Sequence, residues 1–293
     1  CMSLATVPEL EQIDGASYKR VVDLTFDATG IRLGDGKQRM VSGRLRRLVQ
    51  EAGLTSYSAY LDHAQQTPAE RSKLLDSLTT NETYFFRERY QLDAFRDEVL
   101  PGLVERRRDE RRLTLWSAGC STGEEVYTLA MLLRASGLVD GWEVRVFGSD
   151  ISRRVLQHAR RGVYGEAAFR ALPAAHRGDF VESSEGRSVR PEIRALCHFG
   201  HLNLLEHRRT AIVGKVDAVF CRNVLIYFDE ASRAKVLRTF WERLHRGGYL
   251  MLGHSESLLQ SATDFEFVHL SQDLVYRRPE ASPTEAPPAG EDR

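Results

Sequence analysis

Apolar residues recur at helical spacing through the first quarter of the chain, and no run there alternates as a strand would. The spacing predicts helices over residues 18–27, 37–52, 56–65 and 67–78. Gly30 and Gly53 follow the first two as C-terminal caps, and Thr67 with Pro68 makes a capped start for the last. We therefore expect residues 1–77 to form an all-α domain.

From residue 90 onward, strand-like apolar runs alternate with helix-like segments. A long helix over residues 90–108, interrupted at Pro101, is followed by strands predicted over 113–116, 142–150, 197–202, 215–221 and 249–252. The helices between them are predicted over 124–133, 151–161 and 231–245, and Gly247-Gly248 is expected to turn the last helix into its strand. This alternation predicts an α/β domain with a mostly parallel, Rossmann-like sheet.

Two segments break the alternation. Residues 179–190 read as a hairpin with its turn near Glu185-Gly186, which predicts a small antiparallel β-subdomain over about 178–198. Residues 265–270 and 274–278 form a terminal hairpin. Residues 279–293 hold four prolines and no apolar periodicity, so we expect a disordered tail there.

Composition and charge exclude several classes of function. Forty-one basic residues balance forty-one acidic ones, so no global field favours nucleic acid. No apolar run approaches the roughly 18 residues that span a bilayer, and no signal-peptide pattern opens the chain. The cysteines lack C-x-x-C spacing, which argues against a metal site or a disulfide framework. A reducing, cytoplasmic setting without membrane insertion is the simplest interpretation.

The strand at 113–116 leads into a small-residue turn and then a helix, the opening of a nucleotide-binding unit. Gly119 and Gly123 permit a tight turn and close approach of a ligand, but no Lys follows as in a phosphate-binding loop. Glu124 and Glu125 occupy the helix start where a phosphate would bind, so a cationic or hydroxyl-rich ligand such as S-adenosylmethionine fits better. An ordinary connection without a ligand is the alternative.

Three further features have both a structural and a functional interpretation. Asp150, at the tip of the second strand, would accept hydrogen bonds from ribose hydroxyls or cap the next helix, and both roles can hold at once. The connector over 78–90 carries consecutive aromatics that either pack the domains together or accompany polar side chains facing a cleft. Arginines of the helix over 37–52 form a solvated face or a docking surface for an acidic partner: Arg44, Arg46 and Arg47.

Several strings together resemble the chemotaxis receptor methyltransferase (CheR) family of protein-glutamate O-methyltransferases. The matching strings are Gly30-Ile-Arg-Leu33 with Lys37, Arg44-Leu-Arg-Arg-Leu48, Leu78-Thr-Thr-Asn-Glu-Thr-Tyr-Phe-Phe-Arg87, Ser121-Thr-Gly-Glu-Glu125, Asp150-Ile-Ser152, Asn203-Leu204, Phe220-Cys-Arg-Asn-Val-Leu-Ile-Tyr-Phe-Asp229 and Gly253-His-Ser-Glu-Ser257. The resemblance runs from about residue 17 to 278. It implies an all-α domain, a linker over 78–90, a methyltransferase domain over 91–278 with its β-subdomain, and S-adenosylmethionine as cofactor.

The resemblance also implies roles for individual residues. The cofactor-binding positions it implies are Asn81, Thr83, Arg87, Gly119, Glu124, Asp150, Asn203, Leu204, Arg222 and Asn223. Arg87 and Tyr227 match the residues nearest the transferred methyl group, although Tyr227 could instead be core. The β-subdomain captures a receptor's C-terminal peptide in some members, and its short insertion here puts that tethering in question.

The implied activity is methylation of glutamate side chains on the acidic cytoplasmic helices of chemoreceptors, by a monomeric enzyme. Arg44, Arg46 and Arg47 would then steer those helices toward the site. Two alternatives remain: a methyltransferase for another substrate, and a sensor or scaffold that binds S-adenosylmethionine without turnover.

Overall fold

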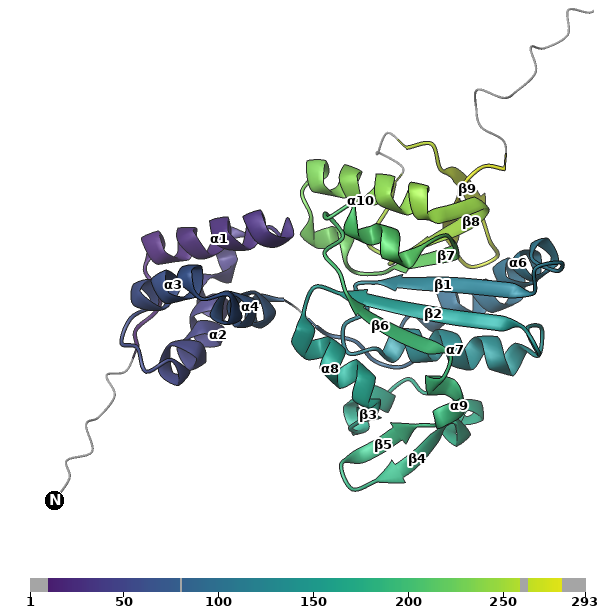
Figure 1. The fold of residues 1–293 in the computed structure, drawn as a ribbon, viewed down its shortest axis with the longest axis horizontal. Helices are drawn as coiled ribbons and strands as arrows, with labels where there is room; N and C mark the ends of the chain where they lie inside the picture. The colour runs from purple at the N-terminus through teal and green to yellow at the C-terminus, as the bar shows by residue number, and fades with distance from the viewer. Residues whose placement is uncertain (1–9, 80, 259–262, 281–293) are drawn as a thin grey trace, which may run out of the picture.

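The computed structural model describes residues 10–79, 81–258 and 263–280, and it shows an all-α domain beside a larger α/β domain (Figure 1). Residues 281–293, which make up most of the predicted tail, lie outside the described residues. None of the described helices is both long and apolar enough to cross a membrane.

The all-α domain contains the helices that the spacing predicts. They are α1 (Gly15–Thr29), α2 (Gln38–Glu51), α3 (Tyr57–Gln66) and α4 (Pro68–Leu78), with the short 3-10 helix η1 (Asp35–Lys37) before α2. The Asp14 carboxylate accepts from the backbone N–H of Ser17 at the start of α1, and Gly30 ends α1 with a φ of 71°. Thr67 makes no side-chain cap hydrogen bond to α4, so that part of the predicted capped start is wrong. Apolar faces of the helices share one core around Val41, Leu45 and Tyr60.

The helix after the linker is continuous rather than interrupted at Pro101. It runs as α5 (Arg89–Ala94), the π-helical η2 (Phe95–Val99) and α6 (Leu100–Arg106). The wider π turn has the N–H of Leu100 donating to the carbonyl of Phe95. Pro101 then lies in the first turn of α6, where its missing N–H costs least.

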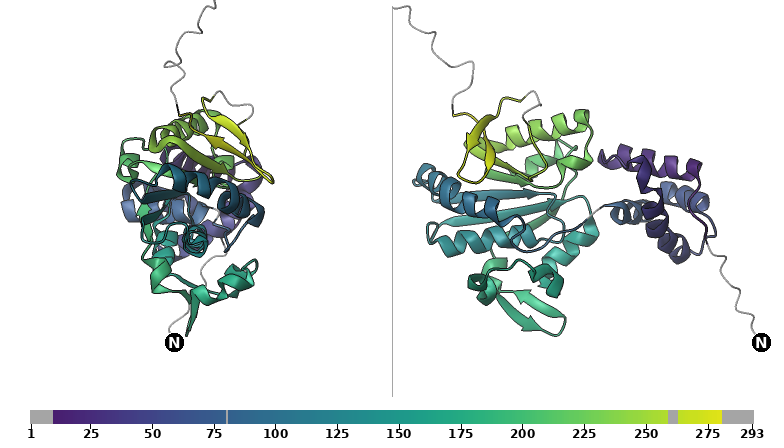
Figure 2. Two further views of the ribbon diagram at one scale, coloured as in Figure 1. Left: turned by 90° about the vertical axis from the view of Figure 1, so that its right-hand side faces the viewer. Right: turned by 180° about the vertical axis from the view of Figure 1, so that it is seen from behind.

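The main sheet has the order β6-β2-β1-β7-β8-β10-β9. Its strands are β1 (Arg112–Ala118), β2 (Glu143–Asp150), β6 (Cys197–His201), β7 (Val216–Cys221), β8 (Leu244–Leu252), β9 (Glu266–His269) and β10 (Leu274–Arg277). The strands from β6 to β8 are parallel, whereas β10 and β9 are antiparallel to their neighbours. Helices α7 (Glu124–Ser136), α8 (Arg153–Arg161) and α10 (Glu230–Arg243) connect and cover them (Figure 2).

Gly247-Gly248 does not turn α10 into its strand, as the sequence predicted. β8 begins directly after α10, and the two glycines lie inside it, where the register with β7 is irregular. A Cβ on Gly248 would lie 2.8 Å from the Asp217 carbonyl oxygen, so the strands approach closely there.

The predicted β-subdomain is present, with different bounds. Its sheet has the order β3-β5-β4, from β3 (Val163–Tyr164), β5 (Gly186–Val189) and β4 (Phe180–Ser183). It therefore starts before residue 178, because β3 pairs with β5, and Cys197 and His198 belong to β6 of the main sheet. Short helices complete it: η3 (Glu166–Phe169), η4 (Ala174–Asp179) and α9 (Pro191–Arg194).

The position of β1 determines where a ligand can bind. The chain passes from β1 to β2 and β6 on one side and then to β7 and β8 on the other, so the strand order reverses at β1. Ligands of open α/β sheets bind beyond the carboxyl ends of the strands at such a reversal. The all-α domain lies at this edge of the sheet (Figure 1).

Candidate active site

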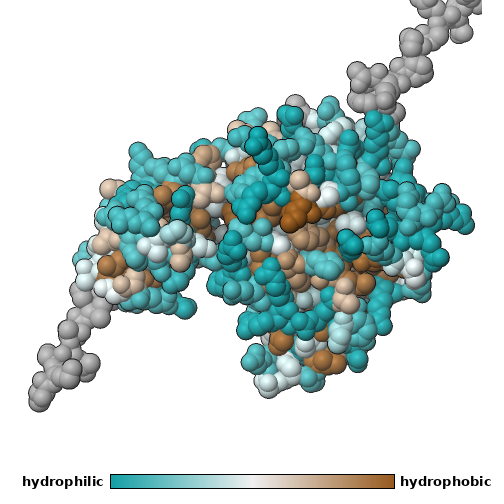
Figure 3. Space-filling model, in the orientation of Figure 1, coloured by the Kyte–Doolittle hydropathy of each residue, from teal (hydrophilic) through white to brown (hydrophobic). Residues whose placement is uncertain are grey.

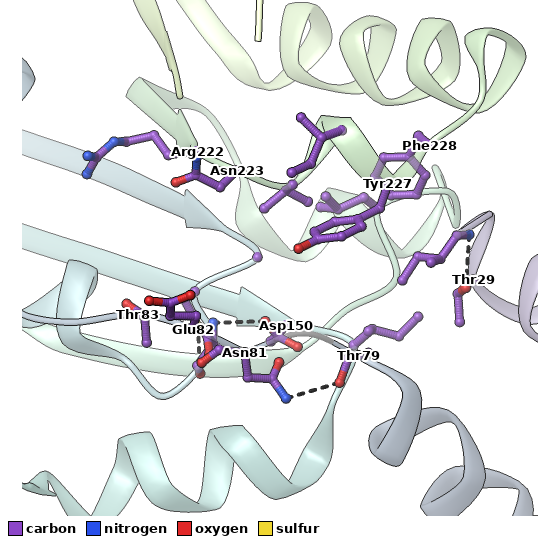
Figure 4. A pocket seen from close by; sticks show the side chains of 18 of the residues that line it. Thr29, Thr79, Asn81, Glu82, Thr83, Asp150, Arg222, Asn223, Tyr227 and Phe228 are labelled. Carbon is purple, nitrogen blue, oxygen red and sulfur yellow. Dashed lines mark hydrogen bonds between the residues drawn. The ribbon is translucent and has the colours of Figure 1, made fainter. Parts of the chain in front are cut away.

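A cavity of about 250 Å³ lies between the all-α domain, the linker and the carboxyl ends of β1, β2 and β7 (Figure 4). Most of the predicted cofactor positions line it: Asn81, Thr83, Arg87, Gly119, Asp150, Asn203, Leu204, Arg222 and Asn223. Tyr227, from the short helix η6 (Leu225–Tyr227), lines it too, and its ring points into the cavity. Residues far apart in the sequence are thus brought to one place.

The loop after β1 has no room for a side chain at Gly119. Gly119 has a φ of 84°, and a Cβ there would lie 2.5 Å from Cγ2 of Val224. The N–H of Gly119 donates to the carbonyl of Ser149, 2.8 Å away, which ties the loop to β2. The backbone of the loop is therefore left open to a ligand, as the sequence predicted.

Asp150 presents its carboxylate to this loop. The carboxylate oxygens accept from the backbone N–H groups of Ser121 and Ser152, each at 2.9 Å. Burial raises the pKa of Asp150, and these two hydrogen bonds oppose the increase. Ser152 caps α8 by accepting from Val155, so the capping interpretation of Asp150 is wrong. Each carboxylate oxygen keeps a second lone pair, which suits the two hydroxyls of a ribose.

Glu124 does not line the cavity, contrary to its predicted cofactor role, and Glu125 does. Consecutive residues of a helix point about 100° apart. The Glu124 carboxylate accepts from the Thr122 hydroxyl at 2.7 Å, and burial raises its pKa. The Glu125 carboxylate instead accepts from the hydroxyl of Ser117 and from Arg222 at 3.0 Å.

Arg222 connects the end of β7 to α5, the helix that follows the linker. Its Nε donates to Gln91 at 2.9 Å, and its guanidinium also pairs with Glu88 and Glu125. Burial raises the pKa of Glu88, but Arg222 and the Asn223 amide outweigh it and the net shift is downward. Arg222 is thus a buried cation whose charge is balanced by acidic neighbours.

Glu256 is a residue whose role the sequence did not reveal. It is 5% exposed, and its carboxylate accepts from a set of backbone N–H groups at 2.7–3.2 Å: those of Asn223, Val224, Ile226 and Gly253. It holds the loop that carries Arg222 and Tyr227, including the left-handed backbone of Asn223 with a φ of 59°. The only available signal was its place in the string Gly253-His-Ser-Glu-Ser257.

The linker combines packing and lining residues, so both interpretations of its aromatics hold. Phe85 is buried against the β-subdomain, where it stacks on Phe169 with ring centroids 5.4 Å apart. Tyr84 lines the cavity, and the Arg170 guanidinium lies 3.7 Å from its ring centroid. Arg87 donates to the carbonyl of Glu82 at 2.8 Å, which orients its side chain beside the cavity.

The all-α domain closes the cavity through the end of α1. The Asn203 amide donates to the carbonyl of Ala28 at 2.9 Å, and the Arg32 N–H donates to the carbonyl of Tyr227 at 2.9 Å. Gly30, at the end of α1, lies so close to the α/β domain that a Cβ there would lie 2.3 Å from Cδ1 of Leu205. Asn203 therefore joins the domains as well as lining the cavity.

The arginines predicted to dock substrate have different surroundings. Arg44 donates to the carbonyls of Leu78 and Thr79, both at 3.1 Å, and so caps the end of α4. Arg47 is exposed and pairs with Glu51 on its own helix at 2.7 Å. Arg46 is half-buried. Their docking role stays a prediction.

Comparison with known families assigns most of this chain. Residues 81–274 match the model described as CheR methyltransferase, SAM binding domain, and residues 16–79 match CheR methyltransferase, all-alpha domain. The chain belongs to the CheR methyltransferase family. Its relatives include chemotaxis protein methyltransferases from Vibrio parahaemolyticus, 38% identical over 85% of this chain and 91% of the relative, and from Borreliella burgdorferi, 32% identical over 82% and 87%. A third, from Pseudomonas aeruginosa, is 37% identical over 85% and 92%.

As a CheR methyltransferase, the protein uses S-adenosylmethionine, and the cavity fits that cofactor. Asp150 offers acceptor positions for a ribose, and the loop at Gly119 admits close approach. The Oδ1 atom of Asn223 is buried in the cavity wall without a hydrogen-bond partner among the described residues, so it can accept from a ligand amine. In the described ranges no cluster of His, Cys, Asp and Glu could hold a metal ion.

Replacing Glu256 with Gln should both destabilise the protein and weaken cofactor binding. The amide nitrogen would face backbone donors and leave them unsatisfied, at about 1–3 kcal/mol each. We expect about 2–4 kcal/mol loss in the free energy of unfolding by urea titration, and at least tenfold weaker S-adenosylhomocysteine binding by calorimetry. The exposed Glu192→Gln control should change neither; equal behaviour of the two variants would contradict the assigned role of Glu256.

The ionised form of Asp150 is expected to be the one that binds ribose. Because burial raises its pKa, affinity for S-adenosylhomocysteine should begin to fall at a higher pH than for an ordinary aspartate as the solution is acidified. Asp150→Asn should bind about 10–100-fold more weakly at neutral pH, since hydrogen bonds to charged groups contribute about 1.5–3 kcal/mol. The variant should also lose this pH dependence in calorimetry; retention of the wild-type profile would exclude Asp150 as its source.

Proposed function

We propose that this methyltransferase transfers a methyl group to glutamate side chains on the acidic cytoplasmic helices of chemoreceptors, producing glutamate methyl esters. The observation that carries the proposal is the placement of Arg87 and Tyr227 on the same cavity as the ribose-binding groups. A guanidinium can bind a carboxylate through two parallel hydrogen bonds, which suits a glutamate substrate. The names of the relatives, chemotaxis protein methyltransferases, support the receptor as its source.

The rim of the cavity favours an acidic substrate as well. Arg32 and Lys37, between α1 and α2, line it together with Arg87. The Arg32 side chain is 67% exposed, so a partner's carboxylate can reach it even though it lies 3.6 Å from Asp229. These cations would raise the local concentration of acidic helices near the cavity.

The chemistry asks little of acid–base groups in the protein. A glutamate side chain has a pKa of about 4.3, so at neutral pH it is already the nucleophilic anion and needs no general base. When bound, S-adenosylmethionine supplies an activated methyl group with a good leaving group. The residues of this chain bind and orient: Arg87 holds the carboxylate, and Tyr227 packs beside it and excludes water. Such alignment can contribute roughly 7–11 kcal/mol to lowering the barrier.

The direct test is transfer of radiolabelled methyl from S-adenosylmethionine to purified receptor cytoplasmic fragments, followed by base treatment. Base-labile label is expected, because carboxyl methyl esters hydrolyse whereas N-methyl groups do not. Fragments with and without their C-terminal peptide should be compared, since dependence on the peptide would show tethering by the β-subdomain. Tight cofactor binding without labelled receptor fragment would favour a sensor that binds S-adenosylmethionine without turnover. Base-stable label would favour a methyltransferase that modifies a different kind of group.

Substitutions at the cavity should separate orientation from cofactor binding. We expect Arg87→Ala to lower kcat/KM about 100-fold or more through loss of the charge-assisted carboxylate contact, and Tyr227→Phe to lower kcat several-fold. Arg134→Ala, on the exposed face of α7, is the matched control for charge. Steady-state methylation is the measurement, and unchanged kcat in both cavity variants would rule out the proposed orientation.

A further inference from the structure

Helix α8 carries a concentration of positive charge that the site does not use. Its sequence holds arginines at positions 153, 154, 160 and 161, and no acidic residue lies between Asp150 and Glu166. All of these arginines are exposed, while Val155, Leu156 and Ala159 anchor the opposite face in the core. Figure 3 shows the corresponding hydrophilic surface over this helix. In a chain with no net charge, such clustering is local.

Few of these charges are neutralised within the protein. Arg153 and Arg154 have neither an ion pair nor a hydrogen bond among the residues that the structure describes. The one hydrogen-bond partner of Arg161 in the described part of the chain is the ring of His158, at 3.3 Å, and Arg160 donates to the carbonyl of Phe199 at 2.8 Å. No described carboxylate pairs with any of them, in contrast to Arg89 of α5, Arg106 of α6 and Arg238 of α10.

Neighbouring elements add to the same field. Arg194, at the end of α9, donates to the carbonyl of Arg160 and extends the basic surface toward the β-subdomain. Burial lowers the pKa of His158, and Arg161 and Arg154 lower it further. Burial likewise lowers the pKa of His201 on β6, with Arg153 and Arg209 acting in the same direction and Glu206 opposing them. Positive charge around α8 therefore exceeds the negative charge that faces it.

The spacing of the arginines matches the repeat of an acidic helix. Arg153 and Arg160 are seven residues apart, as are Arg154 and Arg161, so each pair lies on one stripe of the helix, about 10.5 Å apart. An acidic helix in a coiled coil repeats its exposed positions every seven residues, with the same rise between them. Every third phosphate of a nucleic acid strand recurs at nearly the same interval, so the choice of an acidic helix follows from the proposed substrate.

The location of α8 connects this surface with the cavity. Ile151, just before the helix, lines the cavity, and the helix runs from there toward the small sheet (Figure 1). A partner helix lying along α8 would therefore pass the cavity mouth at one end. We propose that the arginine face of α8 (residues 153, 154, 160 and 161) is a docking surface for an acidic coiled-coil helix. The proposal rests on the proposed function, because it takes the substrate helix as the partner.

The test uses the full chain with Arg153→Gln, Arg154→Gln and Arg161→Gln combined, which leaves the Arg160 hydrogen bond intact. The control combines Arg108→Gln, Arg134→Gln and Arg238→Gln, which removes the same charge from exposed positions on α7, on α10 and in the turn after α6. Binding of a fluorescent acidic coiled-coil receptor fragment is measured by anisotropy at low and high salt. Each exposed ion pair contributes only modestly to the binding free energy. We therefore expect about tenfold weaker binding for the α8 variant at low salt and less than twofold weaker binding for the control.

The difference should disappear at 0.5 M salt, and calorimetry should give both variants wild-type affinity for S-adenosylhomocysteine. Equal loss in the two variants, no loss in either, or no binding of the fragment by the wild type would overturn the proposal. Tighter binding of single-stranded DNA than of the fragment would also overturn it. Methyl transfer by the wild type is measured in parallel: binding that depends on α8 without label would contradict the proposed function but not the docking surface.

Discussion

The cavity depends on the carboxylate of Glu256 more than on any residue that faces the ligand. The loop after β7 has to leave the sheet, pass through a left-handed residue and present Arg222, Asn223 and Tyr227 in quick succession. Backbone N–H groups that point inward in such a loop would be costly without acceptors. One buried carboxylate accepts from several of them and so converts an irregular segment into a rigid wall.

The all-α domain also packs against this rigid wall. Arg32 and Ile31 pair with the backbone around Tyr227 and Phe228, and Asn203 reaches the end of α1. The domains therefore meet at the cavity itself, with the linker passing along its opposite side. In this arrangement the helical domain completes the enclosure of the cavity and carries part of its cationic rim.

Charge is distributed unevenly despite a balanced total. Buried or half-buried arginines serve the fold, as Arg222 does between Glu88 and Glu125 and Arg44 does at the end of α4. The exposed arginines of α8 have no acidic partner among the described residues. The even count of basic and acidic residues argued against a global field, and it could not show a local one, because locality is a property of the folded surface.

By itself, the sequence determined the periodicity of the elements, the α/β class and the positions of most cavity residues. Apolar spacing and glycine placement are encoded locally, so the helices of the first domain, the parallel strands and the loop at Gly119 could be predicted. Motif resemblance predicted Asp150, Asn203 and Tyr227, because several short strings in the same order along the chain carry these residues.

Only the tertiary structure decided which way side chains point and what they meet. It placed Glu125 rather than Glu124 on the cavity, because side chains of consecutive helical residues point about 100° apart. It moved the cap of α8 to Ser152, put Gly247-Gly248 inside β8 and carried the helix through Pro101 by a π turn. It also brought Glu256 to a loop some thirty residues earlier in the chain. Contacts between distant segments depend on how the layers pack, and local sequence patterns do not encode that packing.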